Sequence, residues 1–238
     1  MRPVLASLML AALAIASDAF ANTLITFEEL PGGLTAMVNS PGSAVPAGSQ
    51  LTTQYLASDG VRFSSGGGFA ALVNHGAGNP TGSVPNVIGG SAAAGALNYN
   101  ETITISFFDP ANVLQMATTD FFRIEGDWVP LGSGSAFAEA YDANGTLLAT
   151  TSDTDNKVLG VSGPVLTFSL PGIHSVRIRG DNGTISFDNL EFGTLVAVPE
   201  ASAAAMLALA GLVWGRCART GTRSAADSAG AAGGTRRR

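Results

Sequence analysis

Short stretches in which apolar and polar residues alternate recur along most of this 238-residue chain. The earliest covers residues 24–28, and residues 60–64 restore the same period of two. This period predicts strands with one buried face. Further strands are predicted at 102–108, 121–126, 136–142, 146–151, 165–170, 173–179 and 184–192, with weaker edge strands at 69–73 and 84–88.

The residues between these runs are typical of turns and loops. Asn144-Gly145, between the runs 136–142 and 146–151, is the strongest hairpin signal. Pro171-Gly172 predicts another turn, and the long Ser, Gly and Pro-rich connection at 35–58 allows at most one turn of helix near residues 50–55. Nine or ten short strands without a convincing soluble helix predict an all-β fold, a jelly-roll-like β-sandwich.

The two ends of the chain depart from this pattern. Residues 1–21 combine a basic start, an apolar run and Ala19-Phe20-Ala21, which predicts a secretory signal peptide. Near the other end, fifteen residues without a charge (201–215) are followed by arginines that include Arg216 and Arg219. Arginines beside an apolar segment are retained in the cytoplasm. We therefore expect an exported ectodomain at 22–194, a single transmembrane helix within 195–215 and a cytoplasmic tail at 216–238.

The length of the apolar segment leaves an alternative open. Fifteen helical residues span about 22 Å, which is short of the roughly 30 Å hydrocarbon core of a bilayer. A buried soluble helix or a disordered end is therefore the other interpretation. The segment is rich in alanine and shows no polar stripe, which favours anchoring in the membrane.

The tail also resembles a known sorting signal. Val198-Pro199-Glu200, the apolar segment and the arginines follow the order of the PEP-CTERM tail of bacteria that make extracellular polysaccharide, although Ala201 replaces the second proline. Residues 25–30, 139–145 and 185–192 are similar to exported PEP-CTERM proteins with a sandwich domain and to jelly-roll carbohydrate-binding modules. The resemblance implies an exosortase-type processing enzyme as partner, and transient or stable anchoring in the cell envelope.

The same resemblance implies a structural calcium ion. In jelly-roll binding modules the first and last strands lie near one another, and oxygen ligands from both can hold Ca²⁺. Here the candidates are Glu28 and Glu29 after the first strand and Asp188 in the last one. The alternative is that these carboxylates are ordinary solvent-facing members of alternating strands.

Charge and cysteine content narrow the function classes. Between residues 22 and 200 there are 16 acidic and 5 basic residues, a balance of −11, whereas the end after Gly215 carries 6 arginines and Asp227, a balance of +5. An acidic exterior domain repels nucleic acid. Cys217 is the single cysteine, so no intrachain disulfide can form.

The candidate chemistry points to binding and away from catalysis. His75 and His174 are far apart in sequence, and no hydrolase, metalloprotease or P-loop motif is present. We therefore expect a non-enzymatic exported protein, with a lectin-like module for extracellular polysaccharide as the alternative and a hydrolase as a third hypothesis. Trp128, at a predicted strand end, is the candidate for stacking on a sugar ring, and a Trp at such a place can instead cap the core.

Overall fold

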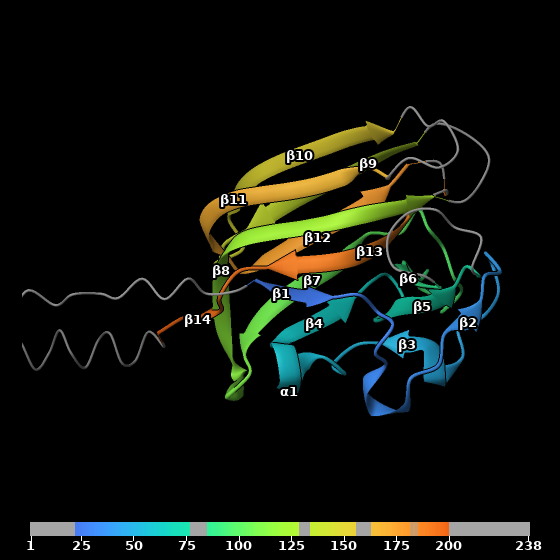
Figure 1. Ribbon diagram of the computed structural model, residues 1–238, viewed down its shortest axis with the longest axis horizontal. Coiled ribbons are helices and arrows are strands. Elements are labelled where there is room, and N and C mark those ends of the chain that lie inside the picture. The colour runs from blue at the N-terminus through green and yellow to red at the C-terminus, as the bar shows by residue number, and fades with distance from the viewer. Residues whose placement is uncertain are drawn as a thin grey trace, which may run out of the picture. The chain divides into compact units, whose positions relative to one another are not determined.

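Fourteen β-strands make up most of the regular structure in the computed structural model, which describes residues 22–76, 85–128, 134–155, 163–181, 183 and 185–199 (Figure 1). Helical structure in these ranges is limited to α1 (Leu56–Asp59) and the 3₁₀ turns η1 (Pro31–Gly33) and η2 (Ala47–Ser49). The all-β prediction is confirmed. The chain divides into two units at the junction of Ala197 and Val198, and every strand lies in the first unit.

Five antiparallel strands form one layer, called the groove layer below. Their order is β4 (Val61–Ser64), β7 (Ile103–Asp109), β12 (Ser175–Gly180), β9 (Gly134–Tyr141) and β10 (Leu147–Asp155). Alternate side chains on β4, β7, β12 and β9 point into the core, among them Phe63, Ile105, Ile178 and Ala138. The polar members of these strands therefore share the opposite, outer face.

The second layer, called the back layer, packs against the inner face of the first. Its main strands follow in the order β11 (Val165–Ile173), β8 (Asn112–Trp128), β13 (Ile185–Phe192), β6 (Asn86–Gly89) and β5 (Ala70–Asn74). Four short strands attach to it: β1 (Thr23–Ile25) on β13, β2 (Met37–Val38) and β3 (Gln50–Leu51) on β5, and β14 (Val196–Ala197) on β8.

Strand β8 links the two layers. Its first residues pair with β7 in the groove layer, where Met116 lies opposite Phe108, and its later residues pair with β11 and β13. Hydrogen bonding therefore joins all fourteen strands into one continuous sheet, which folds over on itself into a sandwich-like pair of layers (Figure 1).

Aromatic side chains fill much of the core between the layers. Phe27, Tyr55 and Phe63 meet edge to face, with ring centroids 5.9 to 6.2 Å apart. Phe107 and Phe192 pack at 5.2 Å and connect the groove layer to β13. Such pairs add about 0.5–1.5 kcal/mol each beyond the burial of their area.

Strands β5 and β6 are buried on both faces. One face joins the main core, and the other is covered by a second apolar cluster that includes Val45, Leu97 and Tyr99. Burial on both faces explains why the sequence at 70–73 is continuously apolar and does not alternate.

The predicted hairpin at Asn144-Gly145 is confirmed. Strands β9 and β10 pair in antiparallel register, and Gly145 adopts a left-handed φ of 78° in the turn. Asp142 fixes this turn, because its Oδ1 accepts hydrogen bonds from the backbone N–H groups of Thr146 and Asn144 at 2.7 and 2.9 Å. These bonds lower the pKa of the Asp142 carboxyl, and the bond from Thr146 contributes most.

Some element boundaries differ from the prediction. Strand β1 ends at Ile25, because Phe27 takes a left-handed φ of 61° that turns its ring into the core. The helical turn expected near residues 50–55 is found slightly later in the chain, as α1. The predicted turn at Pro171-Gly172 lies inside β11, where the pairing with β8 shifts register between Ser169 and Ile173.

Candidate functional site

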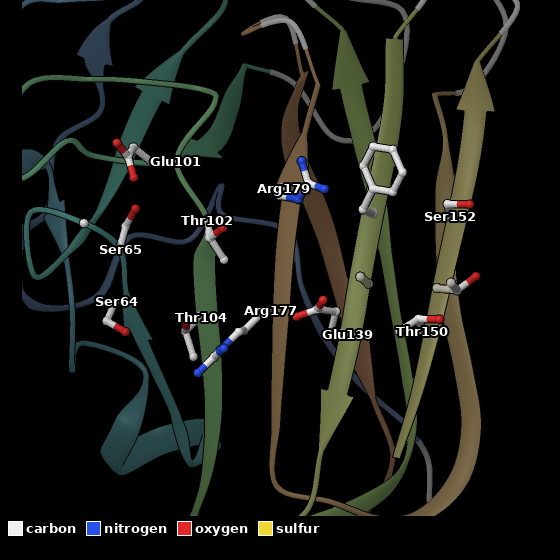
Figure 2. A pocket seen from close by; sticks show the side chains of 14 residues that line it. Ser64, Ser65, Glu101, Thr102, Thr104, Glu139, Thr150, Ser152, Arg177 and Arg179 are labelled. Atoms are coloured by element: carbon white, nitrogen blue, oxygen red, sulfur yellow. The ribbon is translucent and has the colours of Figure 1, made fainter. Parts of the chain in front are cut away.

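A groove of about 710 Å³ crosses the outer face of the groove layer (Figure 2). All five strands of that layer, or the residues next to them, contribute to it. Its lining is dominated by hydroxyl groups and charged side chains: Ser64, Ser65, Glu101, Thr102, Thr104, Glu139, Thr150, Thr151, Ser152, Arg177 and Arg179, together with Gly66, Phe137 and Ala138.

Simple alternation along two central strands places these side chains. On β12, Val176 and Ile178 are buried in the core, so Arg177 and Arg179 point outward. On β9, Ala136, Ala138 and Ala140 are buried, so the outward positions are Phe137, Glu139 and Tyr141.

The strand register arranges the outward residues in rows that run across the layer. In one row Arg177 lies between Thr104 on β7 and Glu139 on β9. Ser64 extends this row on β4, and Thr150 extends it on β10. In the next row Arg179 lies opposite Phe137, and Phe137 lies opposite Ser152. A bound polymer would therefore meet charged and hydroxyl groups in succession.

Three arginines on this face each stack over an aromatic ring. The guanidinium carbon of Arg177 is 4.7 Å from the ring centroid of Tyr141, and that of Arg179 is 4.6 Å from the centroid of Phe137. Arg62, on β4, lies 4.6 Å from the centroid of Phe108. Stacking of this kind orders a long side chain while it stays exposed to solvent.

Glu139 and Tyr141 form a hydrogen-bonded pair beside Arg177. The Tyr141 hydroxyl donates to Oε2 of Glu139 at 2.6 Å. This bond to the carboxylate is the main reason that the pKa of Tyr141 is raised above its ordinary value. The pair keeps the Glu139 carboxylate in a defined position on the groove face.

The predicted calcium ligands lie in different surroundings. Both carboxylate oxygens of Glu28 accept hydrogen bonds from Asn86, one from its backbone N–H at 2.8 Å and one from its side-chain amide at 3.1 Å. Glu29 is exposed and lines a separate pocket of about 240 Å³ beside Tyr55 and Asp59. The structure therefore directs the two neighbouring glutamates to different places.

Asp188 is completely buried next to the end of β1. Its side chain has 0% relative exposure, and its Oδ1 accepts a hydrogen bond from the Asn189 N–H at 2.7 Å. The pairing of β1 with β13 ends at Ile25 opposite Leu190, two residues from Asp188. Glu28 is bonded to Asn86 on β6, and β6 pairs with β13 at Ile88 opposite Phe187. Glu28 and Asp188 thus belong to one region of the fold.

The oxygen atoms in this region are of the chemical kind that binds calcium. Carboxylate and carbonyl oxygens are the ligands that Ca²⁺ prefers. No group of three or more His, Cys, Asp or Glu side chains suited to a metal occurs in the described ranges. Glu28 and Asp188 would hold the ion together with backbone carbonyl oxygens.

The other residues singled out in the sequence are one tryptophan and two histidines. Trp128 is the last residue of β8, opposite Ile185, and its side chain lies outside the described part. His75 shares a hydrogen bond of 2.9 Å with the Tyr99 hydroxyl, and His174 Nδ1 lies 2.9 Å from the Ala117 carbonyl oxygen.

The predicted sorting signal falls mostly beyond the described residues. Val198 and Pro199 follow β14, whereas Glu200, the apolar segment 201–215, Arg216 and Arg219 lie outside the described part, as does the signal peptide at 1–21. Within the described part, no helix has the length and apolar character needed to cross a membrane.

The groove residues are not among the site residues that the sequence predicts. The signal is present in the alternation Arg177-Ile178-Arg179 and in Phe137-Ala138-Glu139-Ala140-Tyr141. What the sequence lacks is the register that places Arg177 opposite Glu139, 38 positions apart in the chain.

Comparisons with known proteins give little further guidance. The chain matches no protein-family model and no curated protein. Among solved structures it is similar to the enzymatically active domain of tailspike protein 4 of bacteriophage CBA120, with 17% identity and a TM-score of 0.33. The match covers 61% of this chain and 20% of that one, so this chain spans a small part of that structure. A likeness this distant does not bear on what the chain binds or does.

Proposed function

We propose that this chain is an exported, non-enzymatic cell-envelope protein that binds extracellular polysaccharide in its groove. The observation that carries the proposal is the groove of about 710 Å³, lined by serine and threonine hydroxyls, two arginines and two glutamates. Hydroxyl, carboxylate and guanidinium groups together supply both donors and acceptors for the hydroxyl groups of a sugar.

The dimensions and polarity of the groove favour a polymer over a small molecule. Four gaps between five strands, at about 4.8 Å each, give a path of roughly 19 Å across the layer. Small-ligand sites are mostly enclosed and apolar. A polar groove on an exposed sheet face suits an extended chain that is held at several points.

The placement of the two groove carboxylates favours binding over hydrolysis. Glu101 precedes β7 and Glu139 lies on β9, with β12 between these two strands. Their backbones are separated by about 10 Å across the layer and a further 10 Å or so along the strands. Glycosidase carboxyl groups flank one bond at about 5 to 9.5 Å, and Glu139 is already bonded to Tyr141.

The remaining parts of the proposal concern the sandwich fold, the export of the chain and a structural calcium ion. Two facing layers of antiparallel strands support a jelly-roll-like sandwich. Export and sorting by an exosortase-type enzyme are supported by the sequences at 1–21 and 198–238. A structural Ca²⁺ held by Glu28 and Asp188 is supported by the buried carboxylate of Asp188 and its closeness to the end of β1.

The test compares the same substitution on the two outer faces. Thr104→Phe places a ring in the middle of the groove, and Thr167→Phe places one on the exposed face of β11. We expect Thr104→Phe to weaken binding to extracellular polysaccharide at least about tenfold, by titration calorimetry, and Thr167→Phe to leave it unchanged. Equal affinities of the two variants would show that the polysaccharide does not bind in the groove. Release of new sugar ends by the wild-type chain would contradict the non-enzymatic part.

A further inference from the structure

The positive charge of the described domain is gathered on one face. Three of the five basic residues between positions 22 and 200 are Arg62, Arg177 and Arg179, and all three lie exposed on the outer face of the groove layer. Of the other two, Arg123 belongs to β8 in the back layer, and Lys157 lies outside the described residues. The groove lining also holds Glu101 and Glu139, so with these three arginines the face is close to neutral in a domain whose overall balance is −11.

These arginines are ordered by rings and not by carboxylates. Within the described ranges, the ion pairs are those of Arg123 with Glu125 and with Glu191. Glu139 lies opposite Arg177, yet its carboxylate accepts the Tyr141 hydroxyl. A guanidinium that stacks on a ring keeps its charge and can use the N–H groups at its edge to bind a planar oxyanion in a bidentate manner.

The arrangement of the three cations fits a repeating ligand. Arg177 and Arg179 are two residues apart on one strand face, so their backbones are about 6.6 Å apart. Arg62 lies opposite Ser106, and Ser106 lies opposite Ser175, so Arg62 occupies the next row on β4. The cations therefore fall on three successive rows, with Arg177 and Arg179 lining the groove and Arg62 beside it on β4, two strands from β12, so a chain that carries several anions could contact more than one of them.

We propose that the groove selects polysaccharides that carry anionic groups, with carboxylates of uronic acids as the ligand class, over neutral polysaccharides. This inference rests on the proposed function, since it names the kind of polymer that the groove binds. Repulsion from the acidic remainder of the domain is screened beyond about 8 Å at physiological ionic strength. Contacts within the groove therefore decide the selectivity.

The experiment uses a pair of ligands that differ in one chemical group. The mature chain is titrated with a polyuronate, with the same polymer after reduction of its carboxyl groups to alcohols, with a sulfated glycan and with single-stranded DNA. Each titration is run with and without a calcium chelator, because calcium can bridge two carboxylates. We expect the polyuronate to bind at least about tenfold more tightly than its reduced form and than DNA.

The variants test separately the charge of the arginines and the planar shape of their guanidinium groups. Arg177→Gln and Arg179→Gln should each weaken polyuronate binding about tenfold and weaken binding of the reduced polymer by a clearly smaller factor, because Gln still donates hydrogen bonds to hydroxyl groups but carries no charge. Arg179→Lys keeps the charge but loses the planar fork, so it should recover only part of the affinity. Arg123→Gln makes the same charge change in the back layer and serves as the control. Melting curves verify that each variant is folded.

The outcomes distinguish the two proposals. Equal binding of the polyuronate and its reduced form would overturn the anionic preference and leave polysaccharide binding in place. A sulfated glycan that binds more tightly than the polyuronate would overturn the choice of carboxylates, and DNA that binds as tightly would overturn recognition of a glycan. No binding of any polysaccharide would overturn both proposals.

Discussion

Tyr55 joins the start of the described chain to the core through its ring and its hydroxyl. The ring packs edge to face against Phe27 and Phe63, and the hydroxyl donates to the Glu29 carbonyl oxygen at 2.8 Å. Burial is the main cause that raises the pKa of Tyr55 to about 12, and the nearby carboxylates of Asp59, Glu29 and Glu28 add to it. The folded protein therefore keeps this hydroxyl protonated above the pH at which a free tyrosine ionises.

This difference in pKa predicts a loss of stability at high pH. An unfolded tyrosine ionises near pH 10, so the contribution of Tyr55 is complete below pH 10 and is lost as the pH rises toward 12. We expect Tyr55→Phe to lack this component and to be about 1 kcal/mol less stable at pH 7, because it loses the bond to Glu29. Urea unfolding at pH 7 and between pH 10 and 12 measures both effects. The same high-pH slope in the two proteins would contradict the prediction.

The groove shows how far single residues can be predicted from sequence. Alternation alone predicts that Arg177 and Glu139 point to the same side of their strands as their neighbours at i±2. It does not say which strands are adjacent, because pairing between distant segments depends on the whole topology. Trp128 stands out in the sequence as an isolated aromatic residue, whereas the rings on the groove face include Phe137 and Tyr141, each stacked with an arginine from another strand.

At the scale of elements, α1 and β7 meet at a glycine. Gly60 ends α1 with a left-handed φ of 69°, and its carbonyl accepts the Phe108 N–H at 2.7 Å. A Cβ at this position would lie 2.3 Å from the Phe108 carbonyl oxygen and 2.5 Å from Leu195. Both the backbone conformation and the close approach require glycine here.

Gly60→Ala should therefore be strongly destabilising. Left-handed strain costs about 1–2 kcal/mol and overpacking about 1–3 kcal/mol, so we expect a loss of roughly 2–5 kcal/mol. Gly42→Ala is the matched control, because Gly42 has a φ of 83° but a Cβ added there would meet nothing within 4 Å. Denaturant unfolding should give a loss of only about 1–2 kcal/mol for the control. Equal losses would show that the close approach to β7 is unimportant.

Element boundaries were harder to predict than element types. Strand β8 begins at Asn112, nine positions before the expected start at residue 121. Its first part includes Leu114, which is 91% exposed, so the apolar pattern there does not mark a buried face. The prediction of strands at 69–73 and 84–88 is confirmed by β5 and β6, but their burial on both faces depends on loops elsewhere in the chain.

For the whole domain, a calcium ion at Glu28 and Asp188 would tie the first strand to the last long one. Binding of an ion to the folded state alone, at about a hundred times its Kd, adds roughly 2.7 kcal/mol, which is several degrees in melting temperature for a domain of this size. We expect a chelator to lower the melting temperature of the mature chain. Glu28→Gln and Asp188→Ala should both reduce the response to calcium, and Glu29→Gln should not.

Two results would oppose the calcium site. A wild-type protein that melts at the same temperature with and without chelator would leave Glu28 as a hydrogen-bond partner of Asn86 alone. A full calcium response in Glu28→Gln would place the ion elsewhere.

The sorting proposal makes a prediction about the mature ends of the chain. In a host that has the matching processing enzyme, the exported protein should begin near Asn22 and end near Pro199-Glu200. Mass spectrometry of protein recovered from the medium measures both ends. Recovery of protein that still carries Arg236 to Arg238 would contradict processing, and replacing Arg216, Arg219 and Arg223 by Glu should disturb membrane topology.

The two-residue strand β14 also has a mechanical consequence. It is joined to β8 by the pairs Val196 with Thr118 and Ala197 with Ala117, whereas β13, the long strand before it, is held by β8 on one edge and by β1 and β6 on the other. A pull on the C-terminal side therefore detaches β14 first and releases residues 193–197, a segment of at most about 17 Å when fully extended. The tension next meets β13, in the back layer.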